Sequence, residues 1–181
     1  RTPPARPRHS MRILLIETST SLCSVALSVD GRTVAVREDG SGRSHASLTA
    51  PFIREILDQA AMTAKDLDAV AVSSGPGSYT GLRVGVSTAK GISFGAGIPL
   101  IGIGTLDILA AEAVSGGLVT PGIRSIIPLL DARRMEVFTA PYSPLGERLE
   151  DVRAEVITPE SFSSRRESVA VLYIGDGVDK C

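Results

Sequence analysis

The fold is decided by the stretch Asp68-Ala-Val-Ala-Val-Ser-Ser-Gly-Pro-Gly-Ser-Tyr-Thr-Gly-Leu-Arg-Val-Gly, residues 68 to 85. Its apolar residues 69 to 72 predict a buried strand, and a helix is expected to follow as far as about Phe94. A glycine-rich loop, Ser74 to Gly81, separates the two. A strand, a loop and a helix in this order are typical of an α/β protein.

The glycine-rich loop has two interpretations, which the sequence leaves open. Backbone N–H groups ahead of a helix could cradle an anion or a nucleotide. The loop lacks the Gly-Lys-Ser/Thr ending of a P-loop, and its glycine spacing differs from the dinucleotide fingerprint, so a tight structural turn is the alternative. The candidate binding residues are Gly75, Pro76, Gly77, Ser78, Tyr79, Thr80 and Gly81.

Strands are expected on both sides of this stretch. The apolar run Ile13 to Ile16 predicts a strand covered on both faces. Asp30-Gly31 lies between two further β-type segments and predicts a hairpin. The next elements are a helix at about Ser47 to Met62, with Pro51 in its first turn or at a kink, a strand at Leu100 to Ile103, and a helix capped by Thr105 that reaches about Val114.

A second unit is expected to begin near Pro121. Strands are predicted at Ser125 to Leu130, Met135 to Ala140, about Arg148 to Val156 and Val169 to Ile174, with a helix start at Thr158-Pro159-Glu160. The division is therefore 11–120 and 121–181. Residues 1–10 carry three Arg and three Pro without apolar periodicity, and we expect them to be a non-native leader before Met11.

Composition excludes several classes of protein. The chain is 43% hydrophobic and 22% charged, as expected of a folded domain. Without the arginines of the first ten residues, 16 basic residues stand against 20 acidic ones, which is the wrong sign for a protein that grips nucleic acid by itself. Two cysteines cannot build a disulfide framework or a zinc cluster. No segment is long and apolar enough for a membrane helix, so we expect a cytoplasmic protein without membrane contact.

Three motifs together resemble the TsaB (YeaZ) family. They are Met-Arg-Ile-Leu-Leu-Ile-Glu-Thr-Ser-Thr at 11–20, the stretch at 68–85 quoted above, and Ile-Pro-Leu-Leu-Asp-Ala-Arg-Arg at 127–134. The resemblance implies an actin-like, ribonuclease-H-type fold with two related βββαβα units, of which we expect the second to be incomplete. It also implies a role in forming threonylcarbamoyladenosine beside the tRNA anticodon.

The resemblance also implies partners. Members of the TsaB family pair with their catalytic paralogue TsaD, and we expect a TsaE-like ATPase to join the complex. The chain is expected to form a homodimer when it is alone and to meet tRNA only through the complex. We expect no required cofactor, with ATP or ADP bound at the level of the complex.

A catalytic role for the chain itself is not expected. The metal-binding pair His-x-x-x-His of TsaD-type sequences would fall on Thr105 and Leu109, neither of which can serve as such a ligand. His45 is isolated in a predicted loop and is interpreted as a surface or capping group. We therefore expect no catalytic residue and no metal site.

Only half of a phosphate clamp is visible. Actin-like ATPases hold phosphates between two loops, one after the first strand of each unit. Glu17 and Thr18 supply an acid and a hydroxyl in the first loop, although Glu17 has the alternative of a hydrogen-bonded carboxylate at a strand end. The second loop, Asp131 to Arg134, contains no glycine to let a backbone wrap a triphosphate. A nucleotide-binding ATPase or phosphotransferase is thus kept as the alternative function.

The helix after the glycine-rich loop carries small residues on two flanks. Gly81, Gly85 and Ala89 recur every four residues on one flank, and Ser87, Gly91 and Gly95 do so on the other. Small residues let another backbone approach closely, so we expect one flank to pack inside the domain and the other against a partner. Because TsaB proteins pair through their first two helices, the expected interface residues are Phe52, Ile56, Gly81, Gly85, Ala89 and, from the second unit, Arg133.

Overall fold

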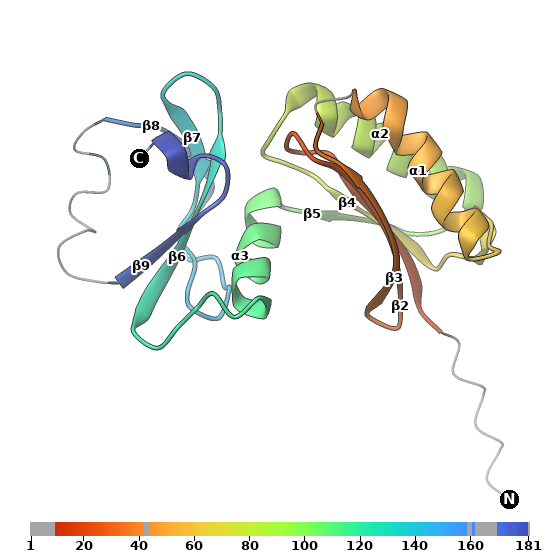
Figure 1. The fold of residues 1–181 in the computed structure, drawn as a ribbon, viewed down its shortest axis with the longest axis horizontal. Coiled ribbons are helices and arrows are strands. Elements are labelled where there is room, and N and C mark those ends of the chain that lie inside the picture. The colour runs from red at the N-terminus through yellow and green to blue at the C-terminus, as the bar shows by residue number, and fades with distance from the viewer. Residues whose placement is uncertain (1–9, 42–43, 159–160, 162–169, 181) are drawn as a thin grey trace, which may run out of the picture. The chain divides into compact units, whose positions relative to one another are not determined.

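A computed structural model of the chain describes residues 10–41, 44–158, 161 and 170–180 (Figure 1). The expected leader therefore lies almost entirely outside the described residues. The elements are β1 (Arg12–Glu17), β2 (Cys23–Val29), β3 (Arg32–Asp39), α1 (His45–Gln59), η1 (Ala64–Asp66), β4 (Ala69–Ser73), α2 (Tyr79–Ala96), β5 (Leu100–Ile103), α3 (Thr105–Ser115), β6 (Ile123–Asp131), β7 (Glu136–Thr139), β8 (Arg153–Val156), β9 (Ala170–Ile174) and η2 (Val178–Lys180). No helix in these ranges is long and apolar enough to cross a membrane.

The chain divides into two compact units. Unit 1 comprises residues 1–73 and 80–102, and unit 2 comprises residues 74–79 and 103–181. This division falls earlier than the boundary expected near Pro121. The reason is helix α3, which buries Leu106, Ala110 and Ala113 in the core of unit 2.

Unit 1 is built on a five-stranded sheet with the order β3-β2-β1-β4-β5. Strand β1 pairs antiparallel with β2 and parallel with β4, and β2 pairs antiparallel with β3. The hairpin predicted at Asp30-Gly31 is confirmed, because both residues have positive φ angles (50° and 77°) as a tight two-residue turn requires.

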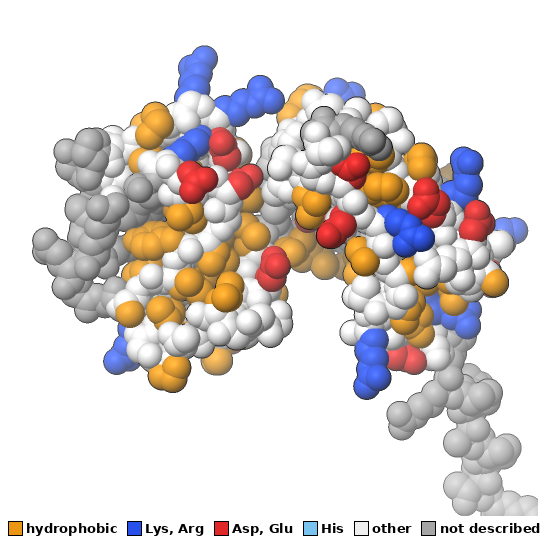
Figure 2. All heavy atoms as spheres, in the orientation of Figure 1, with side chains coloured by type: hydrophobic (Ala, Val, Ile, Leu, Met, Phe, Trp, Pro, Cys, Tyr) orange, Lys and Arg blue, Asp and Glu red, His pale blue; other side chains and the backbone are white. Residues whose placement is uncertain are grey.

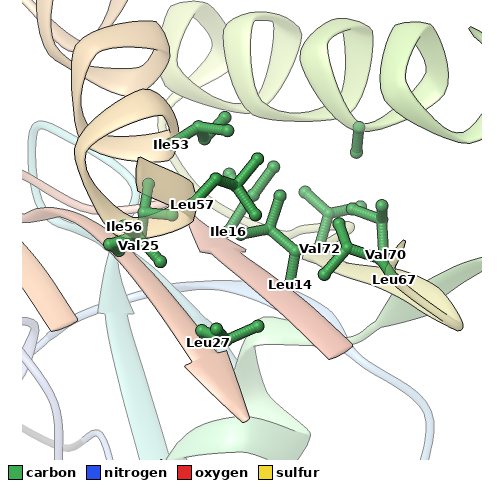
Figure 3. Packing of buried hydrophobic residues seen from close by; sticks show 11 residues of the cluster. Leu14, Ile16, Val25, Leu27, Ile53, Ile56, Leu57, Leu67, Val70 and Val72 are labelled. Atoms are coloured by element: carbon green, nitrogen blue, oxygen red, sulfur yellow. The ribbon is translucent and has the colours of Figure 1, made fainter. Parts of the chain in front are cut away.

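Helices α1 and α2 pack over one face of this sheet. In Figure 3, Ile53, Ile56 and Leu57 of α1 point toward Leu14 and Ile16 of β1 and toward the neighbouring strands. Strands β1 and β2 alternate buried and less buried residues, as expected when one face is sealed by helices. Pro51 lies inside α1, in its second turn, so of the two expected positions, the first turn or a kink, the first turn is excluded.

Unit 2 repeats the strand order of unit 1. Its sheet has the order β8-β7-β6-β9, with β6–β7 and β7–β8 antiparallel and β6–β9 parallel. The first four strands of unit 1 are ordered and directed in the same way, so the expectation of two related units is confirmed. The helix start expected at Thr158-Pro159-Glu160 lies mostly outside the described residues.

A hydrogen bond from a buried tyrosine joins helix α3 to the rest of unit 2. The hydroxyl of Tyr142, which is fully buried, donates to Asp107 Oδ1 at 2.6 Å. Burial raises the pKa of Tyr142, and the hydrogen bond to the Asp107 carboxylate raises it further. The N-cap of α3 is Gly104 and not the expected Thr105, whose amide instead donates to Gly75 O at 2.9 Å.

We predict that Tyr142→Phe destabilises the chain by about 1–3 kcal/mol, because Asp107 loses its buried donor. The variant should also alter alkaline unfolding. Since the folded state raises the pKa of Tyr142, its contribution to stability is complete below about pH 10 and is lost as the pH rises further. Chemical denaturation between pH 8 and 11 checks this, and the free energy of unfolding should fall less steeply for the phenylalanine variant. Parallel curves for both proteins would contradict the prediction.

Candidate partner-binding site

One flank of α2, which carries Gly81, Gly85 and Ala89, packs inside unit 1 and is called its inner flank, an internal seam of the unit. Gly81, Gly85 and Ala89 are all buried. A Cβ added at Gly85 would overlap Thr18 Oγ1, so only glycine permits this approach between α2 and the loop after β1. Gly85 and Ala89 therefore pack inside unit 1, and a partner contact by Gly81, Gly85 and Ala89 stays a prediction.

The other flank of α2, its outer flank, is exposed to solvent. Ser87, Gly91 and Gly95 are exposed, and a Cβ added at either glycine would meet no described atom within 4 Å. Between them, the side chain of Phe94 is 93% exposed. Glycine inside a helix costs roughly 0.5–1 kcal/mol relative to alanine. Since the described part of the chain gives no packing reason for Gly91 and Gly95, an external backbone approaching this flank would explain them.

A hollow of about 560 Å³ adjoins this flank. Its lining residues are Thr63, Ala64, Lys65, Gly91, Ile92, Gly95 and Ala96. The amide and hydroxyl of Thr63 both donate to Asp66 Oδ2 (2.7 and 2.8 Å), and these bonds hold the pKa of Asp66 below its usual value. Asp66 is thereby engaged with Thr63, and the structure gives it no ion pair with Lys65. The hollow combines a small, apolar floor with a cationic rim.

Charge distinguishes the two helices of unit 1. Helix α2 contains no acidic residue and exposes Arg83 and Lys90. Helix α1 exposes Glu55 and Asp58. The outer surface of α2, from Ser87 to Gly95, therefore suits a partner helix with small or apolar residues along its seam and acidic residues beside it. We call this surface, with Phe94 and the hollow, the α2 surface.

The two interface residues expected on α1 differ from each other. Ile56 is fully buried in the core of unit 1, and its contact with a partner stays a prediction. Phe52 is half-buried against the same core and keeps some exposed surface. Its role at an interface stays a prediction.

The polar residues at the end of β1 are joined by hydrogen bonds. Glu17 Oε1 accepts from the amide of Ser19 at 2.6 Å and from the hydroxyl of Ser73 at 2.9 Å. The side chain of Thr18 is fully buried against α2. Glu17 is thus a hydrogen-bonded carboxylate at a strand end, which was the alternative to a phosphate-binding role. Nucleotide contact by Glu17 and Thr18 stays a prediction.

The start of the glycine-rich loop is hydrogen-bonded to the end of β5 and the start of α3. Ser74 donates its amide (2.8 Å) and its hydroxyl (3.0 Å) to Ile103 O, and Gly75 O accepts from the start of α3. Gly75 and Gly77 have φ angles of 110° and 153°, which other residues rarely adopt. These bonds account for the loop as a structural turn, and anion binding by residues 75–81 stays a prediction.

Thr105, Leu109 and His45 were considered as possible metal-binding positions, and each has a defined place in the fold. Thr105 is buried, and Leu109 packs against the core of unit 2. His45 is the first residue of α1 and not part of a loop. Within the described residues, no group of three or more His, Cys, Asp or Glu side chains could hold a metal ion.

Phe94 and Lys65 were missed by the sequence reasoning. Phe94 lies in a helix whose other apolar residues can face the core. The residue types of this helix therefore do not indicate that Phe94 is exposed. Its position between two glycines four residues apart was the available clue. Lys65 comes from a separate short helix, η1, and no local pattern connects it to α2.

Comparisons with known proteins assign the chain to a family. Residues 39–162 match the family model described as TsaD, tRNA N6-adenosine threonylcarbamoyltransferase. Over 178 residues the chain is 31% identical to the Haemophilus influenzae tRNA threonylcarbamoyladenosine biosynthesis protein TsaB, covering 93% of this chain and 73% of that one. The chain belongs to the TsaB family. Escherichia coli TsaB is 39% identical over 132 residues, which are 73% of this chain and 55% of the length of that relative.

The structural comparison supports the same family and fold. YeaZ from Pseudomonas aeruginosa superposes with a TM-score of 0.73 and 26% sequence identity, over 91% of this chain and 84% of that one. The expected actin-like α/β class is confirmed for this TsaB family member. The chain spans a little over half the length of the E. coli relative.

Proposed function

We propose that this chain is a non-catalytic subunit that binds and activates a TsaD-like transferase, which attaches threonylcarbamoyl to the adenosine beside the tRNA anticodon. The E. coli and H. influenzae relatives are named for threonylcarbamoyladenosine biosynthesis, and the matching family model is that of the transferase. One structural observation carries the proposal. Helix α2 holds two exposed glycines that cost stability and have no packing reason within unit 1.

The α2 surface supplies the features of a helix-to-helix interface. Gly91 and Gly95 would let a partner helix approach closely, and Phe94 would become the aromatic anchor. Full burial of a phenylalanine side chain contributes about 1.5–3 kcal/mol. Lys65 and Lys90 at the edge would select an acidic partner surface. In the absence of the transferase, we expect two copies of the chain to form a homodimer.

The residue types at positions 105 and 109 favour a subunit over an enzyme. Thr105 and Leu109 stand where a metal-binding pair would be expected, and both belong to the packed start of α3. ATP or ADP, if used, and a TsaE-like ATPase would then act in the complex.

The direct test mixes the chain with the TsaD-like protein of the same organism and analyses the mixture by size-exclusion chromatography with light scattering. Separate elution of the two proteins at micromolar concentrations would refute the proposed pairing.

We predict that the chain alone leaves tRNA unmodified, even when threonylcarbamoyl-adenylate is supplied. Adding the TsaD-like protein should start the reaction, and mass spectrometry of digested tRNA measures the modified nucleoside. The complete mixture is the positive control. Modified nucleoside in a rigorously partner-free reaction would show that the chain is itself the catalyst. Micromolar binding of magnesium-ATP with measurable turnover in a calorimeter would favour the alternative, an actin-like ATPase or phosphotransferase.

A further inference from the structure

The turn between β6 and β7 has an unfavourable backbone for its sequence. Arg133 and Arg134 occupy it with φ angles of 68° and 47°, in the left-handed region. The amide of Ala132 donates to Glu136 O at 3.1 Å and closes the turn. Such turns are normally made by glycine, asparagine or aspartate, because a larger side chain costs stability there. Two successive arginines in these conformations point to a use for their side chains.

Both guanidinium groups are available to an external ligand. Both residues are exposed, and the described residues give neither side chain a hydrogen bond or ion pair. The neighbouring carboxylate of Asp131 is already engaged, because Lys180 Nζ and the amide of Arg133 both donate to its Oδ1. The Lys180 bond, followed by the Arg133 amide, holds the pKa of Asp131 below its usual value. Asp131 therefore stays ionised, and its carboxylate is held mainly by Lys180 and the Arg133 amide, with a weaker attraction to the Arg133 side chain.

A second carboxylate near the turn has a structural role as well. Asp176 Oδ1 accepts the amide of Asp131 at 2.8 Å, which joins the end of β6 to the segment after β9. Lys180 also donates to Glu136 O at 3.1 Å. The base of the turn is thus held by hydrogen bonds that involve Asp131, Asp176 and Lys180. The two arginine side chains at the tip have no hydrogen bond or ion pair within the described residues.

We propose that Arg133 and Arg134 bind backbone phosphates of the tRNA while the chain is in its complex with the transferase, an inference that rests on the proposed function. Guanidinium forks match the oxygens of a phosphate, and such contacts need charge and direction more than buried apolar area. Figure 2 shows Lys and Arg side chains standing out from the end of unit 2 where Figure 1 draws this turn. A narrow, charged tip suits an RNA backbone better than a protein interface, whose core is apolar.

The size of this contact agrees with the charge of the chain. Its net charge is −1, so it cannot hold RNA through a broad basic surface. Two phosphate contacts would instead add to the RNA-binding surface of the transferase. The expected effect is therefore on the affinity of the complex for tRNA and not on binding by the isolated chain.

The test uses two double variants of the full chain. Arg133→Gly with Arg134→Gly removes both guanidiniums and also relieves the backbone strain, so loss of folding does not confound the result. Arg133→Lys with Arg134→Lys keeps the charge and removes the forks. Arg124→Gln, an exposed arginine on β6, is the matched control. Each is purified with the TsaD-like protein, and the affinity for a tRNA transcript is measured across a range of salt concentrations.

The glycine variant should lower the affinity of the complex for tRNA at least tenfold at low salt and reduce the slope of log affinity against log salt by roughly one to two. The lysine variant should fall between, and the control should match wild type. Co-elution with the partner should be unchanged. Unchanged tRNA affinity and slope would overturn the inference, as would weakened pairing with the transferase, which would place an acidic protein surface at the tip. Failure of the wild-type chain to pair would overturn the proposed function, and the inference with it.

A second experiment distinguishes binding of RNA phosphates from binding of ATP phosphates. Titration of magnesium-ATP into the isolated chain should give the same result for wild type and for the glycine variant. A tenfold loss of ATP affinity, with tRNA binding by the complex intact, would assign the arginines to the nucleotide instead and overturn the inference.

Discussion

Gly85→Leu is expected to destabilise unit 1 by about 3 kcal/mol or more, because the leucine side chain must displace Thr18 and separate α2 from the end of β1. Sequence reasoning assigned Gly85 to the partner interface and would give the opposite result, lost pairing with a stable fold. Thermal unfolding decides between them. A loss of this size corresponds to a fall in melting temperature of roughly 12 °C or more for a domain of this size.

A double-mutant cycle links the effect to its cause. Gly85→Ala alone should also destabilise the chain, since its Cβ would overlap the Thr18 hydroxyl. Thr18→Ala removes that hydroxyl, so the two substitutions together should cost less than the sum of the separate losses. Strict additivity, or a Gly85→Leu variant that melts like wild type but no longer pairs, would show that the inner flank of α2 is not an internal seam.

Gly91→Leu is expected to reduce pairing with the TsaD-like protein at least 100-fold, equivalent to about 2.7 kcal/mol. The added side chain has open space in the free chain, so the fold should be unaffected or stabilised by up to about 1 kcal/mol, since leucine is the better helix former. This combination of a more stable chain and a weaker complex is the signature of an external contact. Titration calorimetry gives the affinity, and thermal unfolding gives the stability.

Two further variants sharpen this experiment. Phe94→Ala should weaken pairing about tenfold or more without lowering the melting temperature, because its side chain packs on almost nothing in the free chain. Ser115→Leu adds an exposed leucine at the end of α3 and should change neither property. If Gly91→Leu and Phe94→Ala both pair like wild type, the α2 surface is not the interface.

Most strands could be predicted from the sequence because their signals are local. The apolar runs of β1 and β4 and the Asp30-Gly31 turn each specify their structure within a few residues. The two flanks of α2 could not be told apart in this way, since both carry small residues at the same spacing. The difference arises from Thr18, which is 67 positions earlier in the chain than Gly85 and contacts it only after β1 and α2 have packed together.

Other failures of prediction have the same physical origin. Thr105 has the composition of a helix cap, but its amide is bonded to the carbonyl of Gly75, and Gly104 takes the cap position. The positive φ angles of Arg133 and Arg134 have no signal in their residue type, since arginine is not a usual residue of such turns. For Thr105, a contact with a distant part of the chain overrides the local preference.

Residues 74–79 of the glycine-rich loop belong to unit 2, whereas the strand before them and most of the helix after them belong to unit 1. During synthesis on the ribosome, residues 74–79 therefore emerge long before the rest of the unit they join. Unit 1 can close around its own sheet once residue 102 has left the exit tunnel, but the loop must wait for Ile103 and α3 to supply its hydrogen-bonding partners. For the same reason, no single proteolytic cut releases either unit intact, and a fragment ending at residue 102 would carry this loop without the segment that orders it.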